Sequence, residues 1–417
     1  MAGPFEGLRV VEFGRFIAAP YCGQLLADGG ADVIKVEPLD GDETRRHEEI
    51  IPGEGRQFLN KNRGKRSLAV DLDNPTVLAA VQRLARSADI VVANFRPRQA
   101  ERLGLAYEQL AADNPRLIFA ENTAYGRKGP MAGMPGMDVV LAAYSGLLNV
   151  TSDGPLMPPQ PIIDYTAGLL LSWGVSTALY ARERTGRGQR IDVALLQAAL
   201  VLQNNGINHI DAIDGWRHEF VEYLKTAFVN GATWADVLAK HQDLQLHAPS
   251  RVYYGFLRTG DGMVAVAALP RPLRIRFMEI VGFDDPWSRD PTRVPDDARA
   301  YADELAATVE QRLRTQSTAY WCEALAAAGI PVGPVRLREQ LIDDEQVLAN
   351  GFVTRLEHEL VGGITVVAPP VGFSATPLAA ERPSPTLGQH TAAILAEAGL
   401  NKEQIELLSA QGAIRTG

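Results

Sequence analysis

The sequence contains little cysteine, with only Cys22 and Cys322 among its 417 residues. Two thiols are too few for a disulfide framework or a cysteine-rich metal site, and they fit a reducing compartment. The first residues, MAGPFEGLRVVEF, lack the basic stretch and apolar core that are typical of a secretory signal. We therefore expect a cytoplasmic protein.

Positively charged residues are outnumbered by negatively charged ones. The chain carries 41 lysines and arginines against 50 aspartates and glutamates, which gives a formal net charge of −9 at pH 7. An acidic chain repels polyphosphate in bulk, so we expect no nucleic-acid partner. Any anionic ligand must be held by a local cluster of cations.

Long hydrophobic runs are nearly absent. One segment, residues 165–181, is free of charge for 17 residues and has the composition of a short membrane span. It lies at the lower length limit for a span, and it contains threonine, serine and glycine. We expect a buried helix packed on a sheet here, and no membrane partner.

Three motifs with known chemistry are missing. The first predicted strand is followed by GRFIAAP instead of the G-x-G-x-x-G turn of a dinucleotide site, which argues against a nicotinamide cofactor. The seven histidines form no H-E-x-x-H motif, so a catalytic zinc is not expected. No G-x-S-x-G motif of a serine hydrolase occurs.

Short β-rich runs alternate with helical patterns over the first two hundred residues. Each run is apolar enough to be buried on both faces, and the predicted strands are 8–13, 32–37, 67–72, 89–94 and 117–121. This alternation predicts parallel strands joined by crossover helices, in a doubly wound α/β sheet. Such sheets bind ligands beyond the carboxyl ends of their strands.

The middle of the chain differs in pattern. From about Trp216 the sequence becomes helical and polar, and residues 251–269 predict a hairpin that turns at 259–262. We interpret this section as a second, smaller α+β domain. Toward the end, the proline-rich segment 369–385 predicts a surface linker.

Two short stretches are dense in cations. The first precedes a predicted strand and the second follows one; they contain Lys61, Arg63, Lys65 and Arg66, and Arg96, Arg98 and Arg102. An isolated basic run is most often a solvated loop. Two basic loops on neighbouring connections of a sheet could instead grip a phosphate-rich ligand, and the sequence leaves both interpretations open.

Two aspartates are candidate nucleophiles. Asp164 ends the string PQPIID, directly before the uncharged helix, where it would serve as a helix N-cap. Alternatively, the helix N-terminus keeps this carboxylate ionised for nucleophilic attack. Asp138, in the loop GPMAGMPGMD, is the rival candidate, and its ordinary role would be to order a turn.

The sequence resembles the family III CoA-transferases, also called the CaiB/BaiF group, over nearly its whole length. The resemblance is carried by separated strings that agree in order and spacing: LRVVEFGRFIAAPYCGQLLADGGADVIKVEP, NRGKRSLAVDL, ANFRP, PGMD, IDYTAGLLLSWGVSTALYARERTGRGQRIDVAL, AGIPVGPV, PPVGFSATP and LGQHTAAIL. Within the family, the likeness extends to formyl-CoA transferase and, more distantly, to α-methylacyl-CoA racemase.

This resemblance implies a fold and a reaction. It implies a large Rossmann-like CoA-binding domain made of residues 1–215 and 331–417, a small domain over 216–330, and two interlocked subunits of a homodimer. The implied partners are an acyl-CoA donor and a carboxylic acid acceptor. Coenzyme A and acyl-CoA are then substrates, no cofactor is permanently bound, and no metal is needed.

The resemblance also implies site residues. The family nucleophile matches Asp164, and the CoA-contacting positions match Ile17, Ala18, Val70, Asp71, Leu72, Asp73, Asn94, Phe95, Arg96, Arg102, Gly136, Met137, Asp138 and Val139. An oxalate-using branch has glutamine at the position of Ile17 and a glycine run over the site. The apolar Ile17 and the missing glycine run argue against oxalate or formate as the acyl partner.

Two alternatives stay open at this stage. Racemases of the family use a histidine and an aspartate to exchange the α-proton, and here the histidine position is Met137, which cannot accept a proton. A non-catalytic CoA-binding protein is the other alternative. Tyr125, Met131, Met134 and Met137 near the site suggest an apolar or mixed acyl group.

Overall fold

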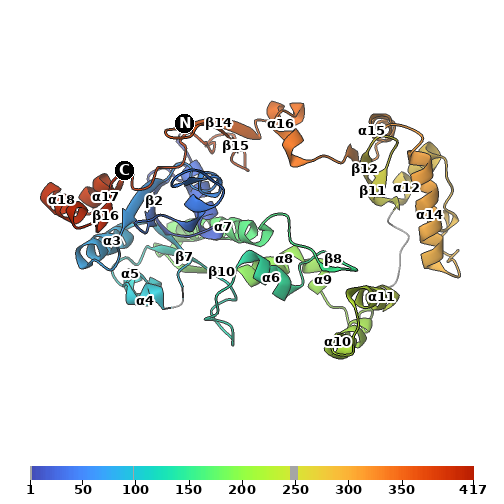
Figure 1. The fold of residues 1–417 in the computed structure, drawn as a ribbon, viewed down its shortest axis with the longest axis horizontal. Coiled ribbons are helices and arrows are strands. Elements are labelled where there is room, and N and C mark those ends of the chain that lie inside the picture. Colours follow the sequence, from blue (N-terminus) through green and yellow to red (C-terminus); the bar gives the residue numbers. More distant parts are fainter. Residues whose placement is uncertain (1, 97, 245–251) are drawn as a thin grey trace. The chain divides into compact units, whose positions relative to one another are not determined.

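The computed structural model describes residues 2–96, 98–244 and 252–417, and it contains two compact units (Figure 1). The first unit comprises Met1–Val150, Pro155–His209 and Glu345–Gly417, and the second comprises Thr151–Gly154 and Ile210–Asp344. The first unit is therefore built from both ends of the chain. The domain ranges 1–215, 216–330 and 331–417 stay a prediction.

A seven-stranded sheet forms the centre of the first unit. Its strands are β1 (Arg9–Phe13), β2 (Asp32–Glu37), β5 (Arg66–Val70), β6 (Ile90–Ala93), β7 (Ile118–Thr123), β10 (Arg190–Ala194) and β16 (Ile414–Arg415). The strand order is β10-β7-β6-β1-β2-β5-β16, and every neighbouring pair is parallel except β16 with β5. Apart from the edge strand β16, this is the order of a Rossmann fold, so the predicted doubly wound sheet is confirmed.

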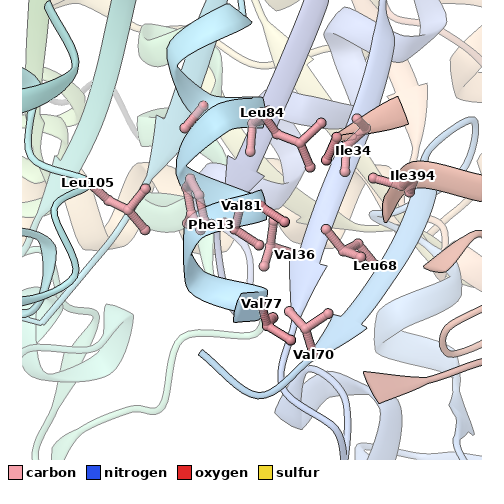
Figure 2. Close-up of a cluster of buried hydrophobic side chains, with 14 of the residues drawn as sticks. Phe13, Ile34, Val36, Leu68, Val70, Val77, Val81, Leu84, Leu105 and Ile394 are labelled. Atoms are coloured by element: carbon pink, nitrogen blue, oxygen red, sulfur yellow. The ribbon is translucent and has the colours of Figure 1, made fainter. Parts of the chain in front are cut away.

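The strands are apolar on both faces because helices cover both sides of the sheet. Val11 and Ile34 belong to one core cluster with α3 (Pro75–Ser87), α17 (Thr391–Glu397) and α18 (Lys402–Ala410). Figure 2 shows Val77, Val81 and Leu84 of α3 in this cluster. The alternate strand residues, such as Val10 and Val33, belong to a cluster with α1 (Ala18–Asp28) and α7 (Ile162–Thr185).

Helix α7 contains the uncharged segment of the sequence. By length and composition it could span a membrane, as no other helix in the described part of the chain could. One face is buried, and Gly168 on that face lies so close to α1 that a Cβ would be 2.8 Å from the Ala18 carbonyl oxygen. The expected core helix is confirmed for this face, whereas Trp173 and Tyr180 are exposed.

The basic stretch 61–66 is paired inside the first unit. Arg63 forms a buried two-bond ion pair with Asp28 at 2.9 and 2.7 Å, and the other members also have partners within the unit. Those contacts are Lys61 with Gln57, Lys65 with Glu12, and Arg66 with Asp32 and Glu397. The stretch is neither a solvated loop nor an anion grip, so both interpretations are wrong here.

The second unit holds a three-stranded antiparallel sheet. Strands β11 (Tyr254–Arg258) and β12 (Met263–Ala267) form the predicted hairpin, and β13 (Val332–Pro334) pairs with β12. The predicted start of the hairpin, Arg251, lies outside the described residues. The helices of this unit are α10 (Trp216–Ala227), α11 (Trp234–Leu244), α12 (Arg271–Val281), α13 (Pro286–Arg289), α14 (Ala298–Leu313) and α15 (Thr318–Ala327).

Shorter elements complete the described part of the chain. They are η1 (Glu43–Arg46), β3 (Glu49–Ile51), β4 (Glu54–Gly55), α2 (Arg56–Leu59), α4 (Gln99–Arg102), α5 (Tyr107–Ala111), α6 (Asp138–Ser145), β8 (Val150–Thr151), β9 (Gly154–Pro155), α8 (Leu195–Leu202), α9 (Asn204–Ile207), η3 (Arg338–Leu341), α16 (Glu345–Ala349), β14 (Val353–His358) and β15 (Gly362–Val367). The proline-rich segment 369–385 contains no helix or strand. Its end is packed inside, because the carbonyl of Pro385 accepts a hydrogen bond from buried Arg45 at 3.1 Å, so a surface linker describes only part of it.

Candidate active site

A large cavity lies at the carboxyl ends of the central strands in the first unit. Its volume is about 1380 Å³, and its walls include the segments that follow β1, β5, β6 and β7. Strands β1 and β6 are neighbours from which the strand order runs in opposite directions, so their carboxyl ends form the topological switch point. Ligands of doubly wound sheets bind at such a point.

A second cavity of about 680 Å³ lies in the same unit. Its walls combine polar side chains with apolar ones, and they include Arg46, His47, Gln57 and Met157. Four residues line both cavities: Phe16, Ile17, Met137 and Asp164. Among these four, only Asp164 carries a nucleophilic or titratable side chain.

Asp164 lies in the first turn of α7 and does not cap it. The helix begins at Ile162, and its N-cap residue is Pro161, which has no side-chain acceptor. The expectation that Asp164 precedes the helix as its N-cap is therefore wrong. The helix already includes Ile162 and Ile163, because Ile163 packs into a buried cluster with α6 and α8.

The backbone donors at the start of α7 are all accounted for without the Asp164 side chain. The carboxylate oxygen Oδ2 of Asp138 accepts the N–H of Ile163 at 2.9 Å and that of Asp164 at 3.1 Å. The N–H of Ile162 reaches Gln160 O at 2.8 Å. Asp138, at the start of α6, thus replaces the missing cap.

The Asp164 carboxylate is buried and unpartnered. Only 9% of the residue is exposed, and among the described residues no hydrogen bond or ion pair reaches its side chain. Burial and, to a smaller extent, the negative charge of Asp138 raise its pKa, the positive charge of Lys61 lowers it, and the net result is a pKa of about 7. The helix end was expected to keep this group ionised, but its N–H groups are bound to Asp138, so that expectation is wrong.

Lys61 is the buried cation that acts on Asp164. It is 1% exposed, and its Nζ donates to Gln57 Oε1 at 2.6 Å and to the Gln57 carbonyl at 3.2 Å. The same Nζ lies 5.8 Å from the ring centre of Tyr165. Burial lowers the pKa of Lys61 to about 8, so the cation persists at neutral pH.

The predicted site residues lie together at these cavities. The first cavity is lined by Ile17, Ala18, Val70, Asp71, Leu72, Asp73, Asn94, Phe95, Arg96, Arg102, Gly136 and Met137. The remaining two, Asp138 and Val139, line the second cavity. Of the residues expected near an acyl group, Met134 lines the first cavity and Met137 lines both. Tyr125 and Met131 are not among the residues lining either one.

Gly136 places the loop that carries Asp138. A Cβ on this glycine would lie 2.6 Å from Leu141 Cδ2 and 2.7 Å from Ala124 Cβ, distances that real side chains do not tolerate. Glycine therefore allows the backbone to approach α6 and the residue that follows β7 closely. This close approach positions Asp138 at the start of α7.

Several cavity residues were missed in the sequence. Arg15 and Arg127 line the first cavity, but Arg15 stands alone in the sequence and Arg127 has only Lys128 beside it, so neither belongs to a marked basic stretch. Phe16 lines both cavities with a φ of 64°, a strained backbone angle for a bulky residue. Its only signal is its position directly before Ile17.

The cations of the first cavity differ in how they are paired. Arg15 pairs with Glu43 at 3.0 Å, Arg102 pairs with Asp73 at 3.2 Å, and Arg127 pairs with Glu121. Arg96 and Arg98 are exposed, and no ion pair of their guanidinium groups occurs within the described residues. Arg96 and Arg98 thus offer local positive charge to an anionic ligand, although acidic side chains also line the cavity.

Comparisons with known proteins agree on one family. The family model described as CoA-transferase family III matches residues 5–391. The chain is 34% identical over 411 residues to the succinate–glutarate CoA-transferase of Agrobacterium fabrum, covering 94% of this chain and 95% of that protein. It is 30% identical to the succinyl-CoA:glutarate CoA-transferase of Homo sapiens, covering 94% and 86%. A crystal structure of a variant of Rv3272 from Mycobacterium tuberculosis matches with a TM-score of 0.77 at 30% identity, covering 95% of this chain and 99% of that one.

Proposed function

The chain belongs to CoA-transferase family III, whose members move CoA between carboxylic acids, and from this premise we propose that Asp164 carries the CoA as an aspartyl thioester. One observation supports this assignment above the others. Asp164 is a buried, unpartnered carboxylate that lines both cavities. A group in that position can react with ligands on either side while water is largely excluded.

The first half of the reaction loads CoA onto the protein. A carboxylate oxygen of Asp164 attacks the carbonyl carbon of the donor thioester, the C–S bond breaks, and a mixed anhydride and CoA thiolate form. The thiolate then attacks the aspartyl carbonyl carbon of the anhydride. The donor acid leaves as a carboxylate, and CoA remains on Asp164 as a thioester.

The second half reverses these steps with the acceptor. The acceptor carboxylate attacks the aspartyl thioester, thiolate leaves, and a second anhydride forms. Attack of the thiolate on the acceptor carbonyl releases the new acyl-CoA and restores the Asp164 carboxylate. No net proton is consumed, but attack requires the ionised form, so transfer should fall as the pH drops through about 7, the pKa of Asp164.

The first cavity is the proposed CoA site. Its volume and its arginines suit a ligand with three phosphate groups, and Arg96 and Arg102 are the proposed phosphate contacts. The wall near Asp164 is apolar at Ile17 and Met137, which suits the neutral pantetheine end of CoA.

The second cavity is the proposed site of the acceptor acid. Arg46 in its wall could hold a second carboxylate, which favours a dicarboxylic acid. Relatives named for succinate and glutarate agree with this substrate class. Arg46→Gln should raise the KM for glutarate and leave the KM for the monocarboxylic acid pentanoate unchanged. Arg355 forms an exposed ion pair with Glu357, and neither residue lines either cavity, so Arg355→Gln is the matched control.

Covalent trapping tests the role of Asp164. After incubation with succinyl-CoA, reduction with borohydride or reaction with hydroxylamine should mark residue 164, which mass spectrometry of peptides detects. Asp164→Ala should abolish both label and transfer while the circular dichroism spectrum stays unchanged. A label on Asp138 would overturn the assignment.

One observation favours proton exchange as a second candidate activity. A carboxyl group with a pKa of about 7 suits a general base, which is the role of the aspartate in racemases of this family. Met137 occupies the position of the second base and cannot accept a proton. We therefore expect a chiral 2-methylacyl-CoA to take up no deuterium at the α-carbon in deuterated water. Rapid uptake without CoA exchange would favour the racemase.

An interlocked homodimer is the proposed assembly. Leu169, Trp173 and Tyr180 of α7 are 47%, 69% and 67% exposed, and their spacing places them near one face of the helix. Apolar faces of this kind support association of subunits. Sedimentation analysis should find a dimer, and Trp173→Glu should weaken it. A monomer at all concentrations would contradict the proposal.

A further inference from the structure

We propose that Asp138 is a positioning residue for the transfer reaction, because it occupies the N–H groups at the start of α7 and so leaves the Asp164 carboxylate unpartnered at the cavities. This inference rests on the proposed function of Asp164. It assigns Asp138 a role that differs from contact with CoA and from that of a rival nucleophile.

The first step of the argument is the supply of donors at the helix start. An aspartate in the first turn of a helix normally finds free backbone N–H groups close by. In α7 the N-cap is a proline, so no side chain of the preceding residue can accept these groups. Without another acceptor, the Asp164 carboxylate would be the acidic group nearest to them.

The second step is that Asp138, which lies 26 residues before Asp164 in the sequence, is the acceptor of these N–H groups. Its Oδ2 accepts both the Ile163 and the Asp164 N–H groups, and the residue is only 9% exposed. Gly136 allows the close approach of the loop, and the buried cluster of Leu141 and Ile163 packs α6 against α7. Asp138 is therefore held rigidly where it serves the helix end.

The third step concerns charge. Two buried carboxylates repel one another, and the negative charge of Asp138 adds to burial in raising the pKa of Asp164. A more basic carboxylate is a better nucleophile once ionised. Asp138 thus contributes in two separable ways: its oxygen holds the helix, and its charge makes Asp164 more basic.

Two substitutions separate these contributions. Asp138→Asn keeps an oxygen acceptor and removes the charge, whereas Asp138→Ala removes both. Asp297 supplies the matched control, since its side chain accepts two N–H groups, those of Arg299 and Ala300, at the start of α14 in the second unit. Asp297→Asn and Asp297→Ala change a cap of the same kind in the other unit of the protein.

The readout is the pH profile of kcat/KM for succinyl-CoA and glutarate in the full-length enzyme. For Asp138→Asn, the midpoint of the acid limb should move down by about one pH unit, with the alkaline plateau within about fivefold of the parent. Asp138→Ala should lower the alkaline plateau of kcat/KM at least about tenfold, because the Asp164 carboxylate can then turn to the freed N–H groups. Both Asp297 variants should keep the parent midpoint and plateau.

A second measurement does not depend on activity. The ¹³C resonance of the Asp164 side chain, assigned through its loss in Asp164→Asn, should titrate at lower pH in Asp138→Asn than in the parent. An unshifted titration and an unshifted pH profile in this variant would overturn the inference. If the titration shifts as expected but trapping leaves residue 164 unlabelled, the effect of Asp138 on Asp164 is supported and the proposed function fails.

Discussion

Residues 61–66 and 96–102 of the first unit are both dense in cations, but they lie in opposite electrostatic settings. In the first stretch, Arg63 and Lys65 are 3% exposed and form ion pairs with the buried carboxylates of Asp28 and Glu12. In the second stretch, Arg96 is exposed at the cavity, and Arg102 pairs with Asp73 where both side chains are largely in solvent.

This difference separates two uses of positive charge. A buried cation with a fixed partner contributes to the fold, and removing it leaves an uncompensated charge inside the protein. An exposed cation at the carboxyl ends of the strands contributes little to stability and stays available to an anionic ligand. Substitutions in the two stretches should therefore change different measured quantities.

The largest effect is expected at Arg63. Arg63→Met should lower the free energy of unfolding by about 3–5 kcal/mol, because Asp28 then loses its buried partner. The KM for acyl-CoA should stay unchanged in the folded enzyme. Chemical denaturation followed by circular dichroism measures the first quantity, and steady-state kinetics measures the second.

The control for Arg63 is an exposed pair. Arg338 contacts Glu339 where both side chains are mostly in solvent, so Arg338→Met should change the free energy of unfolding by no more than about 0.5 kcal/mol. The double variant Arg63→Met/Asp28→Leu should recover most of the lost stability. A single variant as stable as the parent would show that burial of the pair is unimportant.

The next effect is expected at Arg96 and Arg102. Each substitution by glutamine should remove about 1.5–3 kcal/mol of CoA binding, so the KM should rise about ten- to hundredfold for every acyl-CoA alike. The thermal unfolding temperature should stay unchanged, in contrast to Arg63→Met. A rise confined to one acyl donor would instead place the residue at the acyl group.

Much of the fold could be predicted from local sequence pattern. The strand at 32–37 and the hairpin turn at 259–262 match the structure, because strands buried on two faces are continuously apolar and the turn is rich in glycine. The sheet order follows from the alternation of strands and helices. These features depend on residues that are neighbours in the chain.

The errors come from contacts between residues far apart in sequence. The partner of Arg63 lies 35 residues away and one partner of Arg66 lies 331 residues away, so the sequence alone could not show that stretch 61–66 is buried. The same applies to α7, whose missing cap is supplied by Asp138. Asp164 was found through its motif, but its electrostatic environment was not.

Lys61 is the member of the first stretch whose charge acts on the candidate active site. Its charge lowers the pKa of Asp164, so Lys61→Met should raise that pKa and move the acid limb of the pH profile up by about one unit. Transfer below the midpoint should fall by up to about tenfold. Well above pH 8 the difference should vanish, because Asp164 is then ionised in both proteins and Lys61 itself loses its proton above about pH 8.

Lys65→Met is the comparison for Lys61. Lys65 lies in the same stretch, but its Nζ contacts Glu12 at 2.7 Å, and Asp164 is not among the charges that shift its pKa. This variant should lose stability and keep the parent midpoint. Equal shifts of the midpoint in both variants would mean that the whole stretch, rather than Lys61 alone, acts on Asp164.

The smallest effect is expected at Asp73, which holds Arg102 in the absence of ligand. The pair is exposed at 3.2 Å, so it is worth no more than about 1 kcal/mol. If a CoA phosphate competes with Asp73 for this guanidinium, Asp73→Asn should lower the KM for acyl-CoA by up to about fivefold, since 1.4 kcal/mol corresponds to tenfold. The gain should disappear in the double variant with Arg102→Gln, because the two residues act on one contact. A higher KM in Asp73→Asn would instead mean that the carboxylate itself contacts CoA, as the family resemblance implies.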